Sequence, residues 1–191
     1  MDEVELRFDW LFKQSYKRGE NEVTEALMKW FCYSTASVQR RFSRQICRLK
    51  RVPIKQITWD ELALQARGKH GVPDATVELG GRYFLLIESK IADRKVSRKQ
   101  LRRHLRRYIA DAEHTEVREL VITPDWKRPR KIDEMPGRYR RLIVWCSWQE
   151  LHHFIKKCTS TAVLIASSGR HAWTSFGITL ASENISGKLY G

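Results

Sequence analysis

The chain has 191 residues, of which 42% are hydrophobic and 30% are charged, and its formal net charge is +14 at pH 7. This length suits one domain that can bury a core, and this composition excludes an intrinsically disordered chain. The apolar runs are too short to span a bilayer, and the acidic start Met1-Asp2-Glu3 is unlike a signal peptide. We therefore expect a cytoplasmic protein with no membrane partner, whose four widely spaced cysteines are free thiols rather than zinc ligands.

Two helices are predicted at the start of the chain. Apolar residues recur every three or four positions over residues 20–33 and again over about 36–50, and Pro53 ends that region. Residues 55–66 are ambiguous between a strand pair and a strand with a short helix. The alternation of Leu62, Leu64 and Ala66 with polar residues favours a strand.

A β-hairpin is predicted next. Residues 74–79 alternate between apolar and polar, Gly80-Gly81 marks a turn, and residues 83–87 are all apolar, as in a strand covered on both faces. A two-residue turn would place Asp74 opposite Ile87. A turn of three residues, or one bulge, would place Asp74 opposite Glu88 on the same face. We predict this second geometry, with Gly81 in a left-handed conformation.

The rest of the chain continues the α/β pattern. Ser97 opens a helix at 97–112, strands are predicted at 120–123 and 142–146, and a helix at 148–157. The residues of the first of these helices that should face the core are Leu101, Leu105, Tyr108, Ile109 and Ala112. From about residue 159 charges become rare, which separates a Ser/Thr/Gly-rich tail (159–191) from one domain (1–158). The predicted fold is α/β, with a central mixed β-sheet flanked by helices.

Asp74, Glu88 and Lys90 form the most informative set of polar residues. Asp and Glu are natural ligands for a hard divalent cation, and a lysine beside a phosphate can stabilise developing charge. Glu88 and Lys90 share a sheet face, whereas Ser89 points away but offers its carbonyl as a ligand. Charges that end an apolar strand are costly unless they are used, so this pattern favours a metal-dependent site.

Pro73-Asp74 and Glu88-Ser89-Lys90 together resemble the signature of the PD-(D/E)xK nuclease superfamily, and the resemblance extends over about residues 19–146. It implies a restriction-endonuclease-like core in the order αβββαβ. It also implies phosphodiester hydrolysis with Mg²⁺, for which Mn²⁺ can substitute.

The resemblance assigns roles to two further residues. Gly19-Glu20-Asn21 resembles the first-helix motif of bacterial members, which implies that Glu20 completes the metal site, with Glu22 and Glu25 as alternatives. Gln100 matches a glutamine that some members carry at the start of the next helix. His104 stands where exonuclease-like relatives have tyrosine, and we expect it at the surface.

Basic residues gather in three runs, at 40–55, 90–107 and 127–141, which favours a phosphate-backbone partner over solvated helix faces. The side chains expected to grip nucleic acid are Arg98, Lys99, Arg102, Arg103, Arg106 and Arg107, with Arg40, Arg41 and Arg44.

The sequence thus predicts a magnesium-dependent nuclease that acts on nucleic acid, with DNA favoured, and that cuts as an endonuclease. Two alternatives stay open. One is a catalytically silent nucleic-acid-binding module on a nuclease-like fold, and the other is an interaction protein with an acidic protein partner. RNA as substrate, the strandedness of the substrate and a homodimer also stay open.

Overall fold

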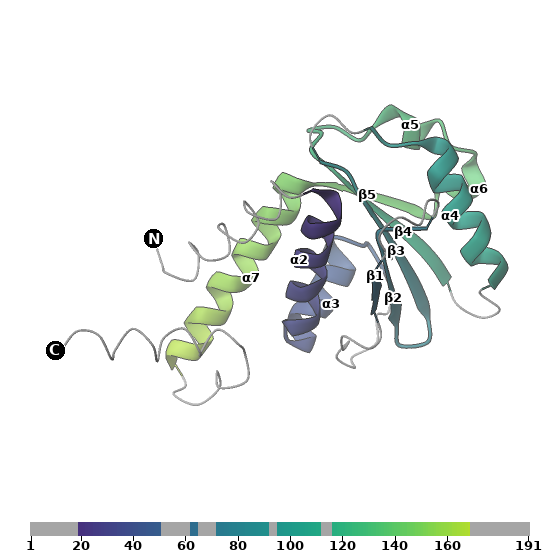
Figure 1. Cartoon of the computed structure of the whole chain (residues 1–191). Helices are drawn as coiled ribbons and strands as arrows, with labels where there is room; N and C mark the ends of the chain where they lie inside the picture. The colour runs from purple at the N-terminus through teal and green to yellow at the C-terminus, as the bar shows by residue number, and fades with distance from the viewer. Residues whose placement is uncertain (1–18, 51–61, 65–71, 92–94, 112–115, 169–191) are drawn as a thin grey trace. The chain divides into compact units, whose positions relative to one another are not determined.

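A computed structural model describes residues 19–50, 62–64, 72–91, 95–111 and 116–168. They form an α/β fold in which helices flank one five-stranded sheet (Figure 1). The predicted fold class, α/β with a mixed sheet, is therefore confirmed. The strands are β1 (Leu62–Leu64), β2 (Ala75–Leu79), β3 (Tyr83–Ser89), β4 (Glu116–Thr123) and β5 (Ile143–Ser147). The helices are α2 (Glu20–Tyr33), α3 (Ala36–Gln45), α4 (Arg98–Asp111), α5 (Arg130–Asp133), α6 (Gly137–Arg140) and α7 (Trp148–Ser168).

The sheet is mixed, with the strands in the order β1-β2-β3-β4-β5. β1, β2 and β3 pair antiparallel, and β3, β4 and β5 pair parallel. A parallel pair needs a crossover between its strands, and α4 supplies the one from β3 to β4, while α5 and α6 lie in the one from β4 to β5. Consequently β3, β4 and β5 all end at the same edge of the sheet.

The hairpin of β2 and β3 has the predicted register. Leu79 pairs with Tyr83 and Ala75 with Ile87, which leaves a three-residue connection of Gly80, Gly81 and Arg82. Gly80 and Gly81 have φ angles of 58° and 67°, in the left-handed region that favours glycine. The predicted three-residue turn is confirmed. The same pairing, continued by one residue beyond Ala75 and Ile87, places Asp74 opposite Glu88.

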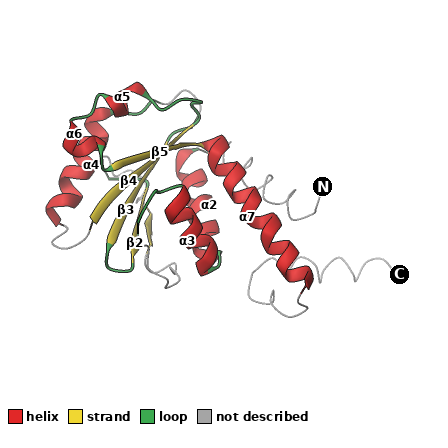
Figure 2. Ribbon diagram, turned by 180° about the vertical axis from the view of Figure 1, so that it is seen from behind, coloured by secondary structure: helices red, strands yellow, loops and turns green. Residues whose placement is uncertain are grey.

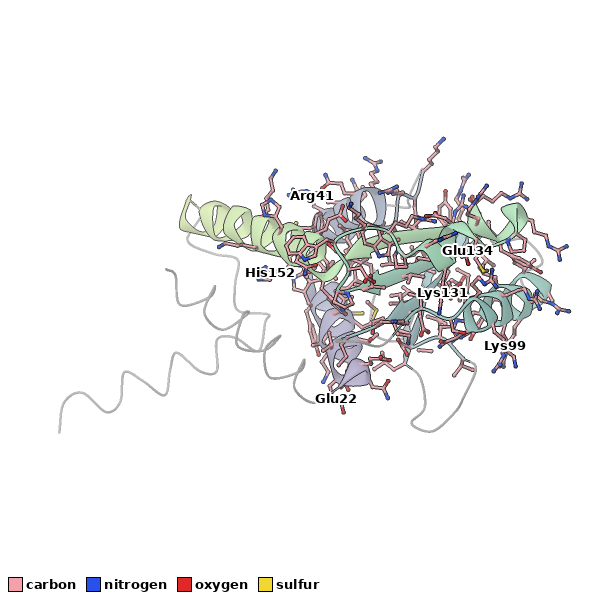
Figure 3. The ribbon with its side chains drawn as sticks, turned by 90° about the horizontal axis from the view of Figure 1, so that it is seen from above. Glu22, Arg41, Lys99, Lys131, Glu134 and His152 are labelled. Carbon is pink, nitrogen blue, oxygen red and sulfur yellow. The ribbon has the colours of Figure 1, made fainter. Side chains whose placement is uncertain are left out.

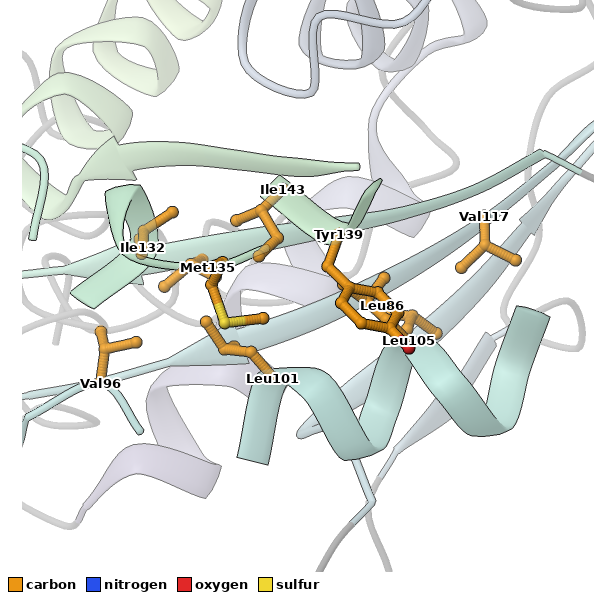
Figure 4. Packing of buried hydrophobic residues seen from close by; sticks show 10 residues of the cluster. Leu86, Val96, Leu101, Leu105, Val117, Ile132, Met135, Tyr139 and Ile143 are labelled. Atoms are coloured by element: carbon orange, nitrogen blue, oxygen red, sulfur yellow. The ribbon is translucent and has the colours of Figure 1, made fainter. Parts of the chain in front are cut away.

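One face of the sheet packs against α4, α5 and α6 (Figure 4). Leu101 and Leu105 of α4 are fully buried there against sheet residues such as Leu86 and Val121. Ile109, which was predicted to face the core, is instead 42% exposed, because the buried stripe of α4 follows residues 101, 104 and 105. Ala112 lies outside the described residues.

The opposite face is covered by α2 and α3 (Figure 2). Val23, Leu27 and Phe31 form the buried stripe of α2, as their spacing predicts. Phe31 contacts Phe42 of α3 with 5.2 Å between ring centroids. The site described below therefore lies in a sheet that is packed on both faces.

The helix predicted over 36–50 ends at Gln45. Arg48 has a φ of 52°, and the amide of Leu49 donates to the carbonyl of Ser43, so the chain turns although Ile46 and Leu49 are buried. For the strand predicted within 55–66, the described part is β1, and the remainder lies outside the described residues.

The chain divides into two compact units, Met1–Phe154 and Ile155–Gly191. α7 continues to Ser168, beyond the predicted end at 157, so the Ser/Thr/Gly-rich segment begins within a helix.

No helix in the described part of the chain has the length and apolar character needed to cross a membrane. All four cysteines are free thiols, as predicted, and the structure shows that they are also buried.

Candidate active site

Glu88, Lys90, Asp74 and Glu20 are all buried and lie at the edge where β3 ends. β3 and its neighbour β2 bring the first three together through the hairpin register. Glu20 is the first residue of α2, which covers the sheet face opposite α4. Gly19 precedes it with a φ of 136°, a conformation that suits glycine at this abrupt start of the helix.

Lys90 joins two of the carboxylates. Its ammonium Nζ donates to Glu20 Oε2 at 3.2 Å and also to Glu88 Oε1. The Lys90 backbone is fixed as well, since its amide donates to the carbonyl of Ile122 and its carbonyl accepts from the Trp148 indole, both at 2.8 Å. The lysine is thus held at a defined place between two acids.

Asp74 is oriented by the backbone of the facing strand. Its Oδ2 accepts from the Ser89 amide at 2.7 Å and lies 3.3 Å from Ser89 Oγ. The Ser89 side chain lies toward α2, where its Oγ is 2.6 Å from Thr24 Oγ1. Thr24 Oγ1 also donates to the carbonyl of Glu20. This chain of contacts ties Asp74 to the start of α2.

Gln100 of α4 contacts Glu88 on the sheet face that α4 covers. Its Nε2 donates to Glu88 Oε1 at 2.7 Å across the loop that joins β3 to α4. Glu88 Oε1 therefore accepts from two side chains, Gln100 and Lys90. Five of the residues singled out in the sequence are brought together by the fold: Glu20, Asp74, Glu88, Lys90 and Gln100.

The site has unusual electrostatics because it is buried. Burial, and then the charge of nearby Asp74, raises the pKa of Glu88 to about 7, although Lys90 opposes the shift. Burial also raises the pKa of Asp74, against the Ser89 amide and Lys90, which lower it. For Lys90 burial lowers the pKa, but Glu88, Asp74 and Glu20 outweigh it and the net shift is upward. Lys90 therefore stays charged at neutral pH.

The donor set has the chemistry that a hard cation needs. The site holds three carboxylates and one ammonium, so when ionised it has a net charge of −2 (three negative charges and one positive), which a divalent cation would balance. Glu88 Oε2 is buried and accepts no hydrogen bond from the described residues. In the described ranges, however, no group of three or more His, Cys, Asp or Glu residues is arranged to hold a metal ion. Lys90 lies between Glu20 and Glu88, and Asp74 Oδ2 binds Ser89.

The two alternatives to Glu20 make no ion pair with Lys90 in the described part of the chain. Glu25 pairs with Lys29 on the outer side of α2, with 41% of its side chain exposed. Glu22 is half-buried, and its carboxylate lies close to Gly19. Of the three glutamates, Glu20 is the one that contacts Lys90.

The predicted basic residues project from different helices (Figure 3). Those of α4 are exposed: Arg98, Lys99, Arg102, Arg103, Arg106 and Arg107. On α3, Arg44 is exposed, whereas Arg40 and Arg41 are half-buried. The Arg41 guanidinium lies over the Phe154 ring, 6.0 Å from its centroid. Packing thus occupies part of the α3 cluster but leaves the α4 cluster in solvent.

Two polar residues near the site were missed. His104 is fully buried, not at the surface as predicted, and its Nδ1 lies 2.8 Å from Oε1 of the equally buried Glu119. His104 occurs at helical spacing with Leu101 and Leu105, a signal that the sequence contained. Glu119 carried no such signal, because the strand was predicted to start after it.

Comparisons with protein-family models, with curated proteins and with solved structures find no match for this chain. Its function is therefore inferred from the geometry of its own residues.

Proposed function

We propose that this chain is a metal-dependent nuclease with a restriction-endonuclease-like core, which hydrolyses phosphodiester bonds, most readily in DNA. The observation that supports it best is that Glu20, Asp74, Glu88 and Lys90 lie together at the end of β3, with Lys90 bound to Glu20 and Glu88. The order of helices and strands, with three antiparallel strands followed by a helix and a parallel strand, is consistent with that core.

Each residue has a role that its position suits. Glu20, Asp74 and Glu88 would supply oxygen ligands for Mg²⁺, with the Ser89 carbonyl assisting, and the bound ion would supply the charge that polarises the phosphate and activates water. Lys90 can then turn its ammonium to the phosphate and stabilise the negative charge that develops there. Gln100 holds Glu88 through Oε1. The exposed basic face of α4 would bind the sugar-phosphate backbone.

A cleavage panel tests this function. Plasmid, linear duplex, single-stranded DNA and RNA are each incubated with Mg²⁺, Mn²⁺ or EDTA. We expect metal-dependent cleavage that falls at least about 10²-fold in Asp74→Ala and Lys90→Ala while nucleic-acid binding persists. Glu78→Gln is the matched control, because Glu78 is an exposed carboxylate of the same strand pair. Equal cleavage by wild type and Asp74→Ala would refute the assignment.

A catalytically silent nucleic-acid-binding module is the second candidate. It is favoured by the ion pairs that Lys90 makes with Glu20 and Glu88, which satisfy the site with a lysine where a nuclease would use a cation. This candidate predicts salt-sensitive DNA binding with no effect of Mg²⁺ or Mn²⁺ on any substrate in the panel.

A further inference from the structure

Behind Glu88 lies a second buried polar pair, His104 of α4 and Glu119 of β4. Both side chains are fully buried, and His104 Nδ1 lies 2.8 Å from Glu119 Oε1. Strand alternation places Glu119 on the same sheet face as Val117 and Val121, the face that α4 covers. The pair is therefore enclosed between the helix and the sheet.

The pair continues from Glu88 itself. His104 Nδ1 lies 3.9 Å from Glu88 Oε2, while Gln100, one helical turn earlier on α4, binds Glu88 Oε1. Residues four apart share a helix face, so α4 presents Gln100 and His104 to the two oxygens of one carboxylate. Apart from this contact, Glu88 Oε2 has no polar partner among the described residues.

Burying two ionisable groups among apolar side chains is costly, and apolar residues of similar size would pack there without that cost. The neighbours of His104 on α4 are the fully buried Leu101 and Leu105, which shows that this surface accepts apolar packing. His104 Nε2 and Glu119 Oε2 also make no hydrogen bond with the described residues. The pair is thus poorly explained as a stabilising contact alone.

We propose that His104, held by Glu119, is a positioning residue that fixes the orientation of the Glu88 carboxylate for binding a divalent cation. The inference rests on the proposed function, in which Glu88 is a ligand. The contact with Glu119 holds the imidazole with its Nδ1 edge toward Glu88. That edge and the Gln100 amide limit the rotation of the carboxylate, so that it need not be ordered when the cation binds.

The test is direct binding of Mn²⁺ to the full chain, measured by electron paramagnetic resonance without substrate. His104→Leu removes the polar edge, and we expect its Mn²⁺ affinity to fall about 10- to 100-fold. His104→Asn keeps a polar atom near the place of Nδ1, so it should restore part of that loss. Thermal melts of the same samples report folding.

A double variant separates positioning from stability. His104→Leu leaves Glu119 buried without its partner, which destabilises the fold, whereas His104→Leu/Glu119→Leu replaces both groups by apolar ones and should recover stability. We expect the double variant to melt near wild type but to bind Mn²⁺ as weakly as His104→Leu. Gln39→Ala, a buried polar change on α3, should lower stability without changing Mn²⁺ affinity.

The outcomes are distinct. If the double variant is folded and binds Mn²⁺ with wild-type affinity, the positioning role is overturned and the proposed function stands. A loss of affinity in Gln39→Ala as large as that in His104→Leu also overturns the positioning role, because it would show a general effect of destabilisation. If the wild-type protein binds no Mn²⁺, the proposed function is overturned, and the positioning role is overturned with it.

Discussion

Glu88 combines three properties in one side chain: it is fully buried, it accepts from Lys90 and Gln100, and its pKa is raised to about 7. A raised pKa means that the folded protein holds a proton on Glu88 at a pH where the unfolded chain, with a pKa near 4.5, has lost it. The contribution of Glu88 to stability therefore falls as pH rises from 4.5 to 7, and this penalty is complete above pH 7.

The first prediction concerns this pH dependence. In EDTA, the free energy of unfolding of wild type should fall relative to that of Glu88→Gln by up to about 1.4 kcal/mol per pH unit between pH 5 and pH 7. Urea unfolding at several pH values measures it. The comparison is needed because burial raises the pKa of Asp74 and Glu119 and lowers that of His104, and these groups contribute to the pH dependence of both proteins. Parallel stability curves for the two proteins would contradict the shift at Glu88.

For single residues, the sequence predicted the acids, the lysine and Gln100, but not the buried pair of His104 and Glu119. Asp74, Glu88 and Lys90 were found because charges beside a continuous apolar strand are conspicuous. His104 is expected at the surface from the sequence but is fully buried. It is buried opposite Glu119, and Glu119 lies within β4 because this strand begins at Glu116, earlier than periodicity indicated.

The β2–β3 hairpin shows how one turn determines the site. Because side chains alternate along a strand, a shift of one residue in the pairing would move Asp74 to the other face from Glu88. The connection through Gly80 and Gly81 sets the observed pairing, and the left-handed φ of both residues lets the chain close over three residues.

The second prediction is that Gly81→Ala lowers the free energy of unfolding by about 1 kcal/mol. An added Cβ at Gly81 meets nothing within 4 Å, so the cost comes from the φ of 67° and not from a clash. Gly137→Ala is the matched control, since its Cβ also meets nothing within 4 Å but its φ is not positive. Urea unfolding compares the two, and equal stability of Gly81→Ala and Gly137→Ala would contradict this account.

Elements differ in how far the sequence determines them. The hairpin was predictable because glycine pairs and strict alternation leave few geometries. The end of α3 was not, because Ile46 and Leu49 continue a helical pattern of apolar residues while the backbone turns at Arg48. Burial depends on where a side chain points, so a turn can bury Ile46 and Leu49 as a continued helix would.

On the scale of the whole molecule, the positive charge is divided between the two faces of the sheet. α4, which includes Gln100, lies on the sheet face that carries Glu88, and α3 lies on the other face (Figure 1). The arginines of α4 are exposed, whereas Arg40 and Arg41 of α3 are half-buried. The α/β class was predictable from the order of helical and strand patterns, but this division of charge required the topology.

The last prediction follows from that division. Neutralising the exposed arginines of α4, in the variant Arg102, Arg103, Arg106 and Arg107→Gln, should weaken DNA binding and reduce its dependence on salt. Each lost phosphate contact lowers the slope of log affinity against log salt by about 0.9, so the slope should fall by roughly 3 to 4 if all four contact phosphate. Fluorescence anisotropy with a labelled duplex between 50 and 200 mM salt, about the range over which such contacts dominate, measures the slope.

The matched control changes Arg40, Arg41 and Arg44 of α3 to Gln. It removes a comparable amount of charge, but two of its three side chains are half-buried, and Arg41 lies over the Phe154 ring. If α4 is the face that meets the phosphate backbone, the α3 variant should keep a slope close to that of wild type. Equal reductions in both variants would show that net charge attracts the DNA without a defined face, and an unchanged slope in the α4 variant would exclude α4 as the binding surface.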